Sequence, residues 1–401
     1  MRLYILICLI IAIVSFSCGK KDVQSIKKDS TNNALSNNPV KKQDSTKKTD
    51  TDTKTDTLTY NYYNNISKFI AGEDLDENSV FYDHTQTYLY KNYKNSMTQS
   101  WNQVSKIRLI KMKEWYDEEI APEVKDSLNL FYPFSGPDIL HSFTFYPYAK
   151  NYYFIALENT GSLPEIENMN ITNVGAYLFN LSQSIRDVMF TSYFLTKKMM
   201  VALKKDKVDG ALPILCLFIS KTGNSILSYE SLYMNSKGDY ADEKNSEYTT
   251  PCLRIVFKKN NSNYLQTIYY FKQDLSNGES LNQSHLLDVI KSKGEFNTYT
   301  KAASYLMHHG NFSTVRDFII NNSITVLQDD TGIPNRYFDR KIWKEKLYGD
   351  YIAPISLFQM RDQPDLRAAY KKNREGGLPF NMGYHVNNSK QHIMFFSKIN
   401  N

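Results

Sequence analysis

The sequence has little cysteine, with four residues in 401. Cys8 lies in the apolar N-terminal run and Cys18 follows that run, which leaves Cys216 and Cys252 in the rest of the chain. Two cysteines exclude the disulfide framework of a small secreted domain and allow one bridge at most. Both lie in apolar stretches, so the sequence is equally compatible with a bridge and with two buried thiols.

The main part of the chain also lacks an excess of charge of one sign. The formal net charge is +6, but Arg2 and the nine Lys and six Asp of residues 18–59 leave only about +2 for residues 60–401. These charges alternate in sign along the sequence. Because nucleic-acid binding needs a basic face, we exclude nucleic acid as a partner.

Signature motifs of the common enzyme classes are missing. The sequence has no Gly-rich phosphate loop, no His-Glu-x-x-His, no Cys-x-x-Cys and no EF-hand spacing. No Gly-x-Ser-x-Gly elbow surrounds Ser135. The single Asp-Thr-Gly at 330–332 has no second copy, although an aspartic protease needs two carboxylates. The cofactor is therefore unknown, and whether the chain is an enzyme stays open.

No apolar run is long enough to span a membrane. The longest one near the N-terminus covers residues 3–14, follows Arg2 and ends in small residues before Cys18. A dozen residues cannot cross roughly 30 Å of hydrocarbon, whereas this pattern is typical of a lipoprotein signal peptide. We predict a signal peptide at 1–17, a lipid on Cys18 and a cell-envelope location at the outer membrane. An ordinary secretory signal with an incidental cysteine is the alternative.

Residues 18–59 contain few apolar side chains and consist mainly of Lys, Asp, Ser, Thr, Asn and Gln. Such a segment buries too little surface to offset the entropy lost on folding. A flexible coil of about 40 residues has a root-mean-square span of roughly 35 Å. We therefore predict a tether that holds the domain at 60–401 away from the membrane. Its Asp-Ser-Thr triplets are similar to a short O-glycosylation signal of some Gram-negative envelopes.

Apolar periodicity predicts both helices and strands in residues 60–401. Helical spacing marks residues 97–115, 174–199, 283–292, 299–308, 314–321 and 366–372. Strand patterns mark residues 152–157, 212–220, 226–233, 253–258, 264–271, 380–385 and 392–397. Because helices and strands do not alternate regularly, we predict one α+β domain with a mixed, mainly antiparallel sheet packed with several helices. Arg108 falls on an apolar helical stripe and is expected to be a partnered structural arginine.

Asp138 and His141 end the densest polar motif, which begins at Tyr132. A spacing of three puts both side chains on one face of a helix, within reach of a shared metal or proton. Asp138 after Pro137 is also a natural helix N-cap, so a catalytic and a structural interpretation both stay open.

Two further motifs supply candidate residues. His308 is a candidate catalytic imidazole, although a structural or capping role with adjacent His309 at a helix end is the default, since neighbouring histidines point about 100° apart. Asp329 and Asp330 are candidate ligands for a hard cation, or form an Asx turn into Gly332.

Four blocks carry a family resemblance: YPFSGPD (132–138), ASYLMH (303–308), QDDTGIP (328–334) and LYGDY (347–351). Together they resemble a family of bacterial envelope lipoproteins with no assigned activity. The resemblance implies one domain and an envelope location, and it supplies no catalytic residues.

We therefore predict a lipid-anchored envelope protein that binds a ligand or partner, with a protein or a glycan as the partner classes left open. The membrane is contacted through the lipid on Cys18. The alternative is an envelope hydrolase, with or without a metal ion, that uses Asp138, Asp329 or Asp330 with His141 or His308. The two hypotheses differ in whether these side chains share one site.

Overall fold

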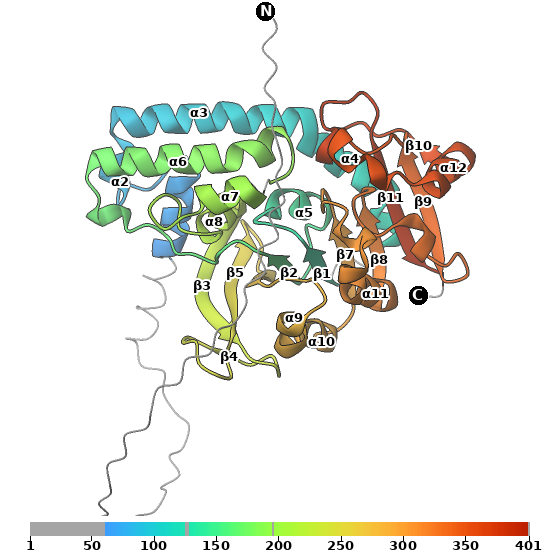
Figure 1. Cartoon of the computed structure of the whole chain (residues 1–401). Coiled ribbons are helices and arrows are strands. Elements are labelled where there is room, and N and C mark those ends of the chain that lie inside the picture. The colour runs from blue at the N-terminus through green and yellow to red at the C-terminus, as the bar shows by residue number, and fades with distance from the viewer. Residues whose placement is uncertain (1–60, 125–127, 195, 400–401) are drawn as a thin grey trace, which may run out of the picture. The chain divides into compact units, whose positions relative to one another are not determined.

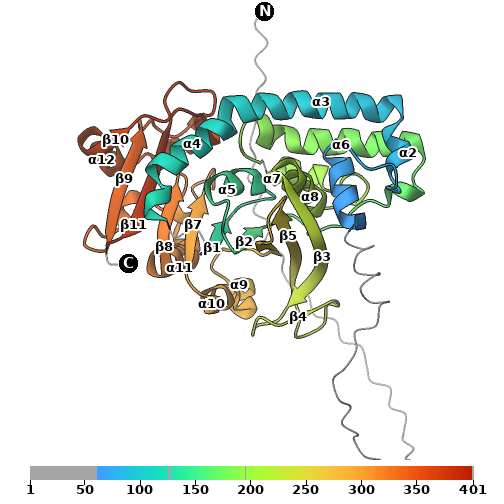
Figure 2. The ribbon, with the colours of Figure 1, turned by 180° about the vertical axis from the view of Figure 1, so that it is seen from behind.

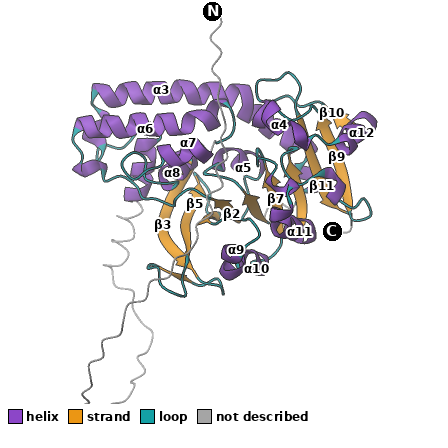
Figure 3. Ribbon diagram, viewed as in Figure 1, coloured by secondary structure: helices purple, strands orange, loops and turns teal. Residues whose placement is uncertain are grey.

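The structure is a computed structural model that describes residues 61–124, 128–194 and 196–399 (Figure 1). The predicted signal peptide and tether lie outside the described residues. None of the described helices combines the length and the apolar character needed to cross a membrane. The described part contains several helices and one mixed sheet, so the predicted α+β class is confirmed (Figure 3).

One sheet of 11 strands has the order β10-β9-β11-β8-β7-β1-β2-β6-β5-β3-β4. In chain order its strands are β1 (Asn129–Pro133), β2 (Asn151–Ala156), β3 (Asn224–Met234), β4 (Tyr240–Ala241), β5 (Thr250–Lys259), β6 (Leu265–Lys272), β7 (Phe296–Thr300), β8 (Ser323–Gln328), β9 (Trp343–Gly349), β10 (Arg374–Gly376) and β11 (His392–Lys398). The predicted hairpin at 253–271 is confirmed as the antiparallel pair β5 and β6.

The sheet has a parallel centre and two mainly antiparallel wings. The five central strands, β8-β7-β1-β2-β6, all run parallel, and β10 is also parallel to β9. The remaining five pairings are antiparallel. The sheet thus contains more parallel pairing than the mainly antiparallel sheet that the sequence predicted. Every residue of β1, β7 and β8 is buried, as expected for parallel strands covered on both faces.

Helices cover both faces of the sheet (Figures 1 and 2). The first face carries α3 (Tyr88–Val104), a π-helical turn (Ser105–Leu109), α4 (Ile110–Glu119), α5 (Ile139–Phe145), α6 (Ile171–Phe190), α7 (Thr196–Ala202) and α8 (Leu212–Lys221). The opposite face carries α9 (Glu279–Ser284), α10 (Leu286–Ser292), α11 (Ser313–Asn322) and α12 (Pro364–Asn373). Residues 61–70 are also helical, and the short α2 (Tyr82–Thr85) precedes α3.

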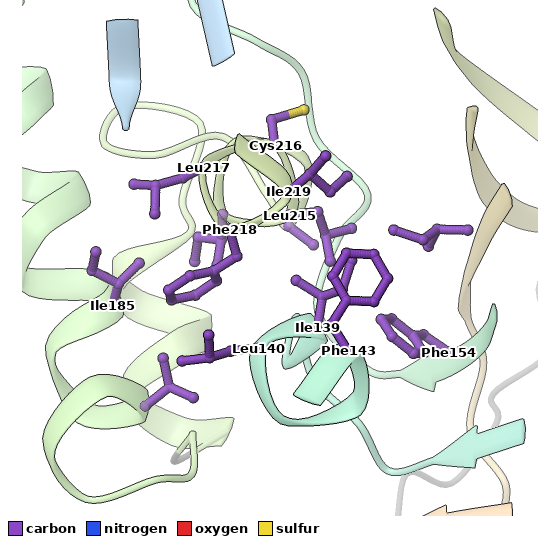
Figure 4. Close-up of a cluster of buried hydrophobic side chains, with 14 of the residues drawn as sticks. Ile139, Leu140, Phe143, Phe154, Ile185, Leu215, Cys216, Leu217, Phe218 and Ile219 are labelled. Carbon is purple, nitrogen blue, oxygen red and sulfur yellow. The ribbon is translucent and has the colours of Figure 1, made fainter. Parts of the chain in front are cut away.

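Side chains of alternate strand residues build a separate hydrophobic core on each face. Leu130 and Tyr132 of β1 belong to the first core, whereas Phe131 belongs to the second. In the first core, α8 packs against α5, β2 and α6 (Figure 4). Phe218 of α8 and Leu140 of α5 are among the residues labelled in this cluster.

Four predicted elements were wrong or incomplete. Residues 212–220 form helix α8 instead of a strand, because all nine are buried and an apolar run without periodicity does not distinguish the two. Residues 299–308 contain the end of β7 and an irregular loop instead of a helix, and residues 380–385 form a loop with a 3-10 turn. The helix predicted at 174–199 is interrupted after α6.

Other predictions are confirmed. Arg108 is a buried structural arginine whose guanidinium donates to the carbonyls of Met189 and Phe190 at the end of α6. Helix α11 and strand β11 lie where the sequence predicts them. Cys216 and Cys252 are both buried free thiols, which decides between the two alternatives left open above.

Candidate functional site

A cavity of about 720 Å³ opens at the carboxyl ends of the central strands. Its walls come from the segments after β1, β2, β6 and β7, together with residues between α6 and α7. From β1 the chain continues to β2 on one side, whereas from β7 it continues to β8 on the other. The adjacent strands β1 and β7 therefore form a topological switch point. Open α/β sheets bind their ligands at the carboxyl ends of the strands at such a point.

A buried charge cluster forms the floor of this cavity. The Lys301 ammonium, directly after β7, lies 2.6 Å from Oδ2 of Asp138, which follows β1. Asp138 also accepts hydrogen bonds from the Tyr132 hydroxyl at 3.1 Å and from Nδ1 of His141 at 2.8 Å. Lys301 donates in addition to the carbonyl of Ser192. The ion pair thus joins the two strands that border the switch point.

The environment fixes the protonation state of the cluster. Burial alone would raise the pKa of Asp138, but the interactions with His141, which is protonated at the low pH where Asp138 titrates, and with Lys301 outweigh burial and hold that pKa well below its usual value. Burial lowers the pKa of His141 to about 4, so the imidazole is neutral at pH 7. Burial also lowers the pKa of Lys301, while the Asp138 charge opposes this. The cluster is therefore a carboxylate neutralised by an ammonium.

Asp138 has the structural role that the sequence allowed as well. It is the N-cap of α5, and its carboxylate accepts a hydrogen bond from the backbone N–H of His141 at 3.4 Å. Nε2 of His141 is buried and makes no hydrogen bond within the described residues. The cap holds Asp138 in place for the ion pair, so both interpretations of this motif describe one arrangement.

Strained backbone gathers around the cavity. Seven described residues other than glycine have positive φ, a conformation that costs energy for any residue with a Cβ atom. Three of them line the cavity (Phe134, Ala302 and Ser304), and Ser192 and Tyr305 directly adjoin lining residues. Strain of this kind persists where the surrounding structure enforces it, and it concentrates at binding and catalytic sites.

Asp329 holds the loop after β8 to the loop after β7. Its Oδ2 accepts the N–H of Ala302 at 3.0 Å, and its Oδ1 accepts the N–H of Thr331 at 3.1 Å. The Thr331 hydroxyl in turn accepts the N–H of Ala303 at 2.8 Å. Burial and the neighbouring charge of Asp330 raise the pKa of Asp329. The hydrogen bonds of Asp329 fix the strained loop beside Lys301.

Asp330 belongs to a neighbouring buried group. Its carboxylate accepts the Tyr305 hydroxyl at 2.7 Å and lies 3.1 Å from Nε2 of His392. The pKa of Asp330 is lowered because the His392 charge and these contacts outweigh burial. His308 sits in a 3-10 turn, with Nε2 3.2 Å from the carbonyl of Asp330. Burial lowers the pKa of His308 to about 4.

Asp329 and Asp330 are engaged by protein donors, and the backbone N–H of Gly332 bonds to the Asp329 carbonyl at 3.2 Å in the predicted turn. Across the described residues, no three His, Cys, Asp or Glu side chains are arranged to hold a metal ion. The structure thus agrees with the turn interpretation of this motif.

The predicted site residues fall into two adjoining groups. Asp138 lines the cavity and His141 contacts Asp138. Asp329, Asp330 and His308 are outside the lining, and the two aspartates contact the loop after β7 through Ala302 and Tyr305. The consecutive residues Lys301 and Ala302 connect the groups, since Lys301 pairs with Asp138 and Ala302 bonds to Asp329.

Sequence reasoning missed Lys301, Tyr132, Tyr305 and His392. A signal for Lys301 exists, because it directly follows the fully buried strand β7. The incorrect prediction of a helix at 299–308 obscured this signal.

The cavity walls are rich in aromatic side chains, and the exposed charged residues Lys197 and Asp274 also line the cavity. Lys301 is neutralised by Asp138, and Lys198 pairs with Asp187 at 3.1 Å. Burial raises the pKa of Glu158 above its ordinary value. Five half-buried rings face this space from four segments: Phe134, Tyr193, Phe194, Phe312 and Tyr384.

Comparison with family models, with curated proteins and with solved structures finds no match for this chain. The resemblance to envelope lipoproteins therefore stays a prediction.

Proposed function

We propose that this chain is a lipid-anchored protein of the bacterial cell envelope whose domain binds a small organic ligand. The observation that carries the binding role is the cavity of about 720 Å³ at the switch point between β1 and β7. Ligand sites typically have volumes of roughly 300–1,000 Å³ and are lined by apolar side chains with a few placed polar groups. The anchor is inferred from the predicted signal peptide at 1–17, which directly precedes Cys18.

The ligand that suits this cavity is uncharged, with flat apolar surface and hydrogen-bonding groups. The half-buried rings offer faces for stacking, and Tyr193 and Tyr384 pack edge to face with centroids 4.9 Å apart. Gln273 and Asn311 supply amide groups at the wall. At the buried floor an ionised group of the ligand would lose hydration without gaining a free opposite charge, because Lys301 and Asp138 already neutralise one another.

Ligand binding is tested by ligand-observed NMR of the full chain with a fragment set of neutral sugars, nucleosides and short acyl esters. We expect binding of at least one class, and a Kd weakened about tenfold by Tyr193→Ala, which removes one stacking face. Tyr264→Ala is the control, since Tyr264 is an exposed tyrosine of the β5–β6 hairpin. Binding that is absent, or equally weakened by both variants, refutes the proposal.

The lipid anchor is tested separately. Cells that express the chain are fed labelled palmitate, and the label is followed in Cys18→Ser and in the matched control Cys8→Ser. We expect loss of label only for Cys18→Ser. Label that survives this substitution refutes the anchor and leaves the binding role untouched.

A further inference from the structure

A second hollow adjoins the cavity. It has a volume of about 620 Å³ and shares Leu157, Gln273 and Asp274 with the cavity lining. Its other walls come from the start of β5 and from α9. Because β5 runs antiparallel to β6, the start of β5 lies beside the carboxyl end of β6. The cavity and the second hollow therefore form one groove along the same end of the sheet.

The two parts of this groove differ in chemistry. Aromatic rings dominate the cavity, whereas most side chains of the second hollow carry a hydroxyl or an amide. These polar residues of the second hollow are Thr249, Thr250, Gln273, Ser280, Gln283 and Ser284. A ligand that occupies the whole groove must therefore offer flat apolar faces at one end and many hydrogen-bonding groups at the other.

Gln273 lies where the two parts meet, and it is only 7% exposed. Its Nε2 donates to the carbonyl of Asp274 at 2.9 Å and to the hydroxyl of Ser280 at 3.0 Å. A carbonyl only accepts, so the amide nitrogen must face Asp274, and this fixes the orientation of the amide. Among the described residues, no group donates to Oε1 of Gln273, and this oxygen is not sealed from solvent. It is left to accept a hydrogen bond from a ligand.

Thr250 provides another buried polar group in the second hollow. The residue is 4% exposed, and its hydroxyl makes no hydrogen bond within the part of the chain that the structure describes. A buried polar group without a partner costs free energy. A ligand hydroxyl that bonds to Thr250 or to Oε1 of Gln273 would recover this cost.

The charged side chains of the second hollow do not select an ionised ligand. Lys272, Asp274 and Glu279 are exposed, and each has a hydrogen-bond partner within the protein, at 2.7, 2.8 and 2.7 Å respectively. The only basic side chain in this lining is therefore engaged, and the two acidic ones would repel an anionic polymer.

We infer that the ligand of this domain is a linear, uncharged oligosaccharide whose sugar units lie along the groove, from the aromatic cavity into the second hollow. This rests on the proposed function, because the cavity must first bind a neutral ligand. A sugar ring has flat C–H faces that stack on aromatic rings, and its hydroxyls both donate and accept hydrogen bonds. The aromatic cavity suits the faces, and the free groups of Gln273 and Thr250 suit the hydroxyls.

Other extended neutral ligands fit the groove less well. An acyl chain would cover Gln273 and Thr250 with apolar surface and leave their polar groups without partners. Extended peptides are commonly bound as an added strand at the edge of a sheet. Strands β5 and β6 are inner strands, paired on both sides, so they offer no such edge to a peptide in the second hollow.

The dependence of affinity on ligand length tests the inference. We propose calorimetric titration of the full chain with neutral oligomers of glucose, of N-acetylglucosamine and of xylose, from one to about six units, and with uncharged peptides of similar length. In at least one sugar series we expect Kd to fall about tenfold or more as units are added, and to level off once the groove is filled.

Two variants assign this gain to the second hollow. Thr250→Val keeps the shape of the side chain and removes the hydroxyl, so we expect Kd for long oligomers to rise about threefold to tenfold, with Kd for the monosaccharide unchanged. Gln283→Ala should act in the same direction, and Gln283 is exposed on α9, so this change spares the core. Thr267→Val is the matched control, because Thr267 lies on β6 outside both linings.

The possible failures are distinguishable. If neutral fragments bind but no sugar series gains affinity with length, or if Thr250→Val and Gln283→Ala behave as Thr267→Val does, the oligosaccharide is refuted and the binding function stands. Affinity that grows with peptide length instead refutes the ligand class. If neither fragments nor oligomers bind to the folded chain, both proposals fail.

Discussion

Loss of the Lys301 ammonium should destabilise the domain strongly. In Lys301→Met the Asp138 carboxylate stays buried with 1% exposure but loses its partner at 2.6 Å. Removing one member of a buried ion pair costs about 3–5 kcal/mol, since the remaining charge is uncompensated. This is a large part of a typical unfolding free energy of about 5–15 kcal/mol.

Urea denaturation measures this loss, and a double variant identifies its cause. Asp138→Asn combined with Lys301→Met removes both charges, so we expect the double variant to be more stable than the sum of the single effects by about 1–3 kcal/mol. Lys113→Met is the control, because Lys113 pairs with Asp117 on an exposed helix surface, where such a pair contributes about 0.3–0.5 kcal/mol.

The pH dependence gives a second readout of the same pair. In the native chain the pKa of Asp138 is lowered, so its stabilising contribution is complete above the unfolded value and is lost only as the pH falls through the lower folded value. In Lys301→Met burial acts against a weaker opposing charge, so the folded pKa of Asp138 rises from its native value and less stability should be lost as the pH falls. A loss below about 1 kcal/mol for Lys301→Met, or exact additivity in the double variant, would refute this account of the cluster.

Three further results are expected. Arg108→Met should cost about 2–4 kcal/mol in urea denaturation, because the carbonyls at the end of α6 lose charged donors; a loss below 1 kcal/mol contradicts this role. Gly383→Ala should cost about 1–3 kcal/mol, since Gly383 has φ of 65° and an added Cβ would lie 2.8 Å from a carboxylate oxygen of Asp329. Gly310→Ala, with open space around it, should be nearly neutral, and equal losses would refute the argument. The folded pKa of His141 is lowered, so stability should fall as the pH decreases from 6.5 towards 4, and unfolding measured across this range should give a shallower slope in His141→Asn.

The sequence predicted the parts of the fold that have a clear period. The hairpin of β5 and β6, helix α11 and the helical stripe around Arg108 follow from local spacing of apolar residues. Residues 212–220 carried no such period, because burial on all sides makes a helix and a strand look alike.

The candidate site was only half predictable for a related reason. Asp138 and His141 are three residues apart, so local geometry links them. The partner of Asp138 is Lys301, which is brought to it by the parallel pairing of β1 with β7. Single-sequence patterns do not encode strand pairing over such separations, and a lone lysine after a strand has no chemical signature by itself.

The pairing of β1 with β7 also bears on how the domain folds. It aligns Asn129 with Phe296, and the β2, β6, β5 and β3 half of the sheet lies between them in the chain. Contacts between such distant segments require a large loop to close, so they form slowly and late. The cavity is lined by segments that follow both β1 and β7, so a ligand bound there contacts both of these strand ends. Ligand binding would stabilise the pairing that forms last, and it should therefore slow global unfolding.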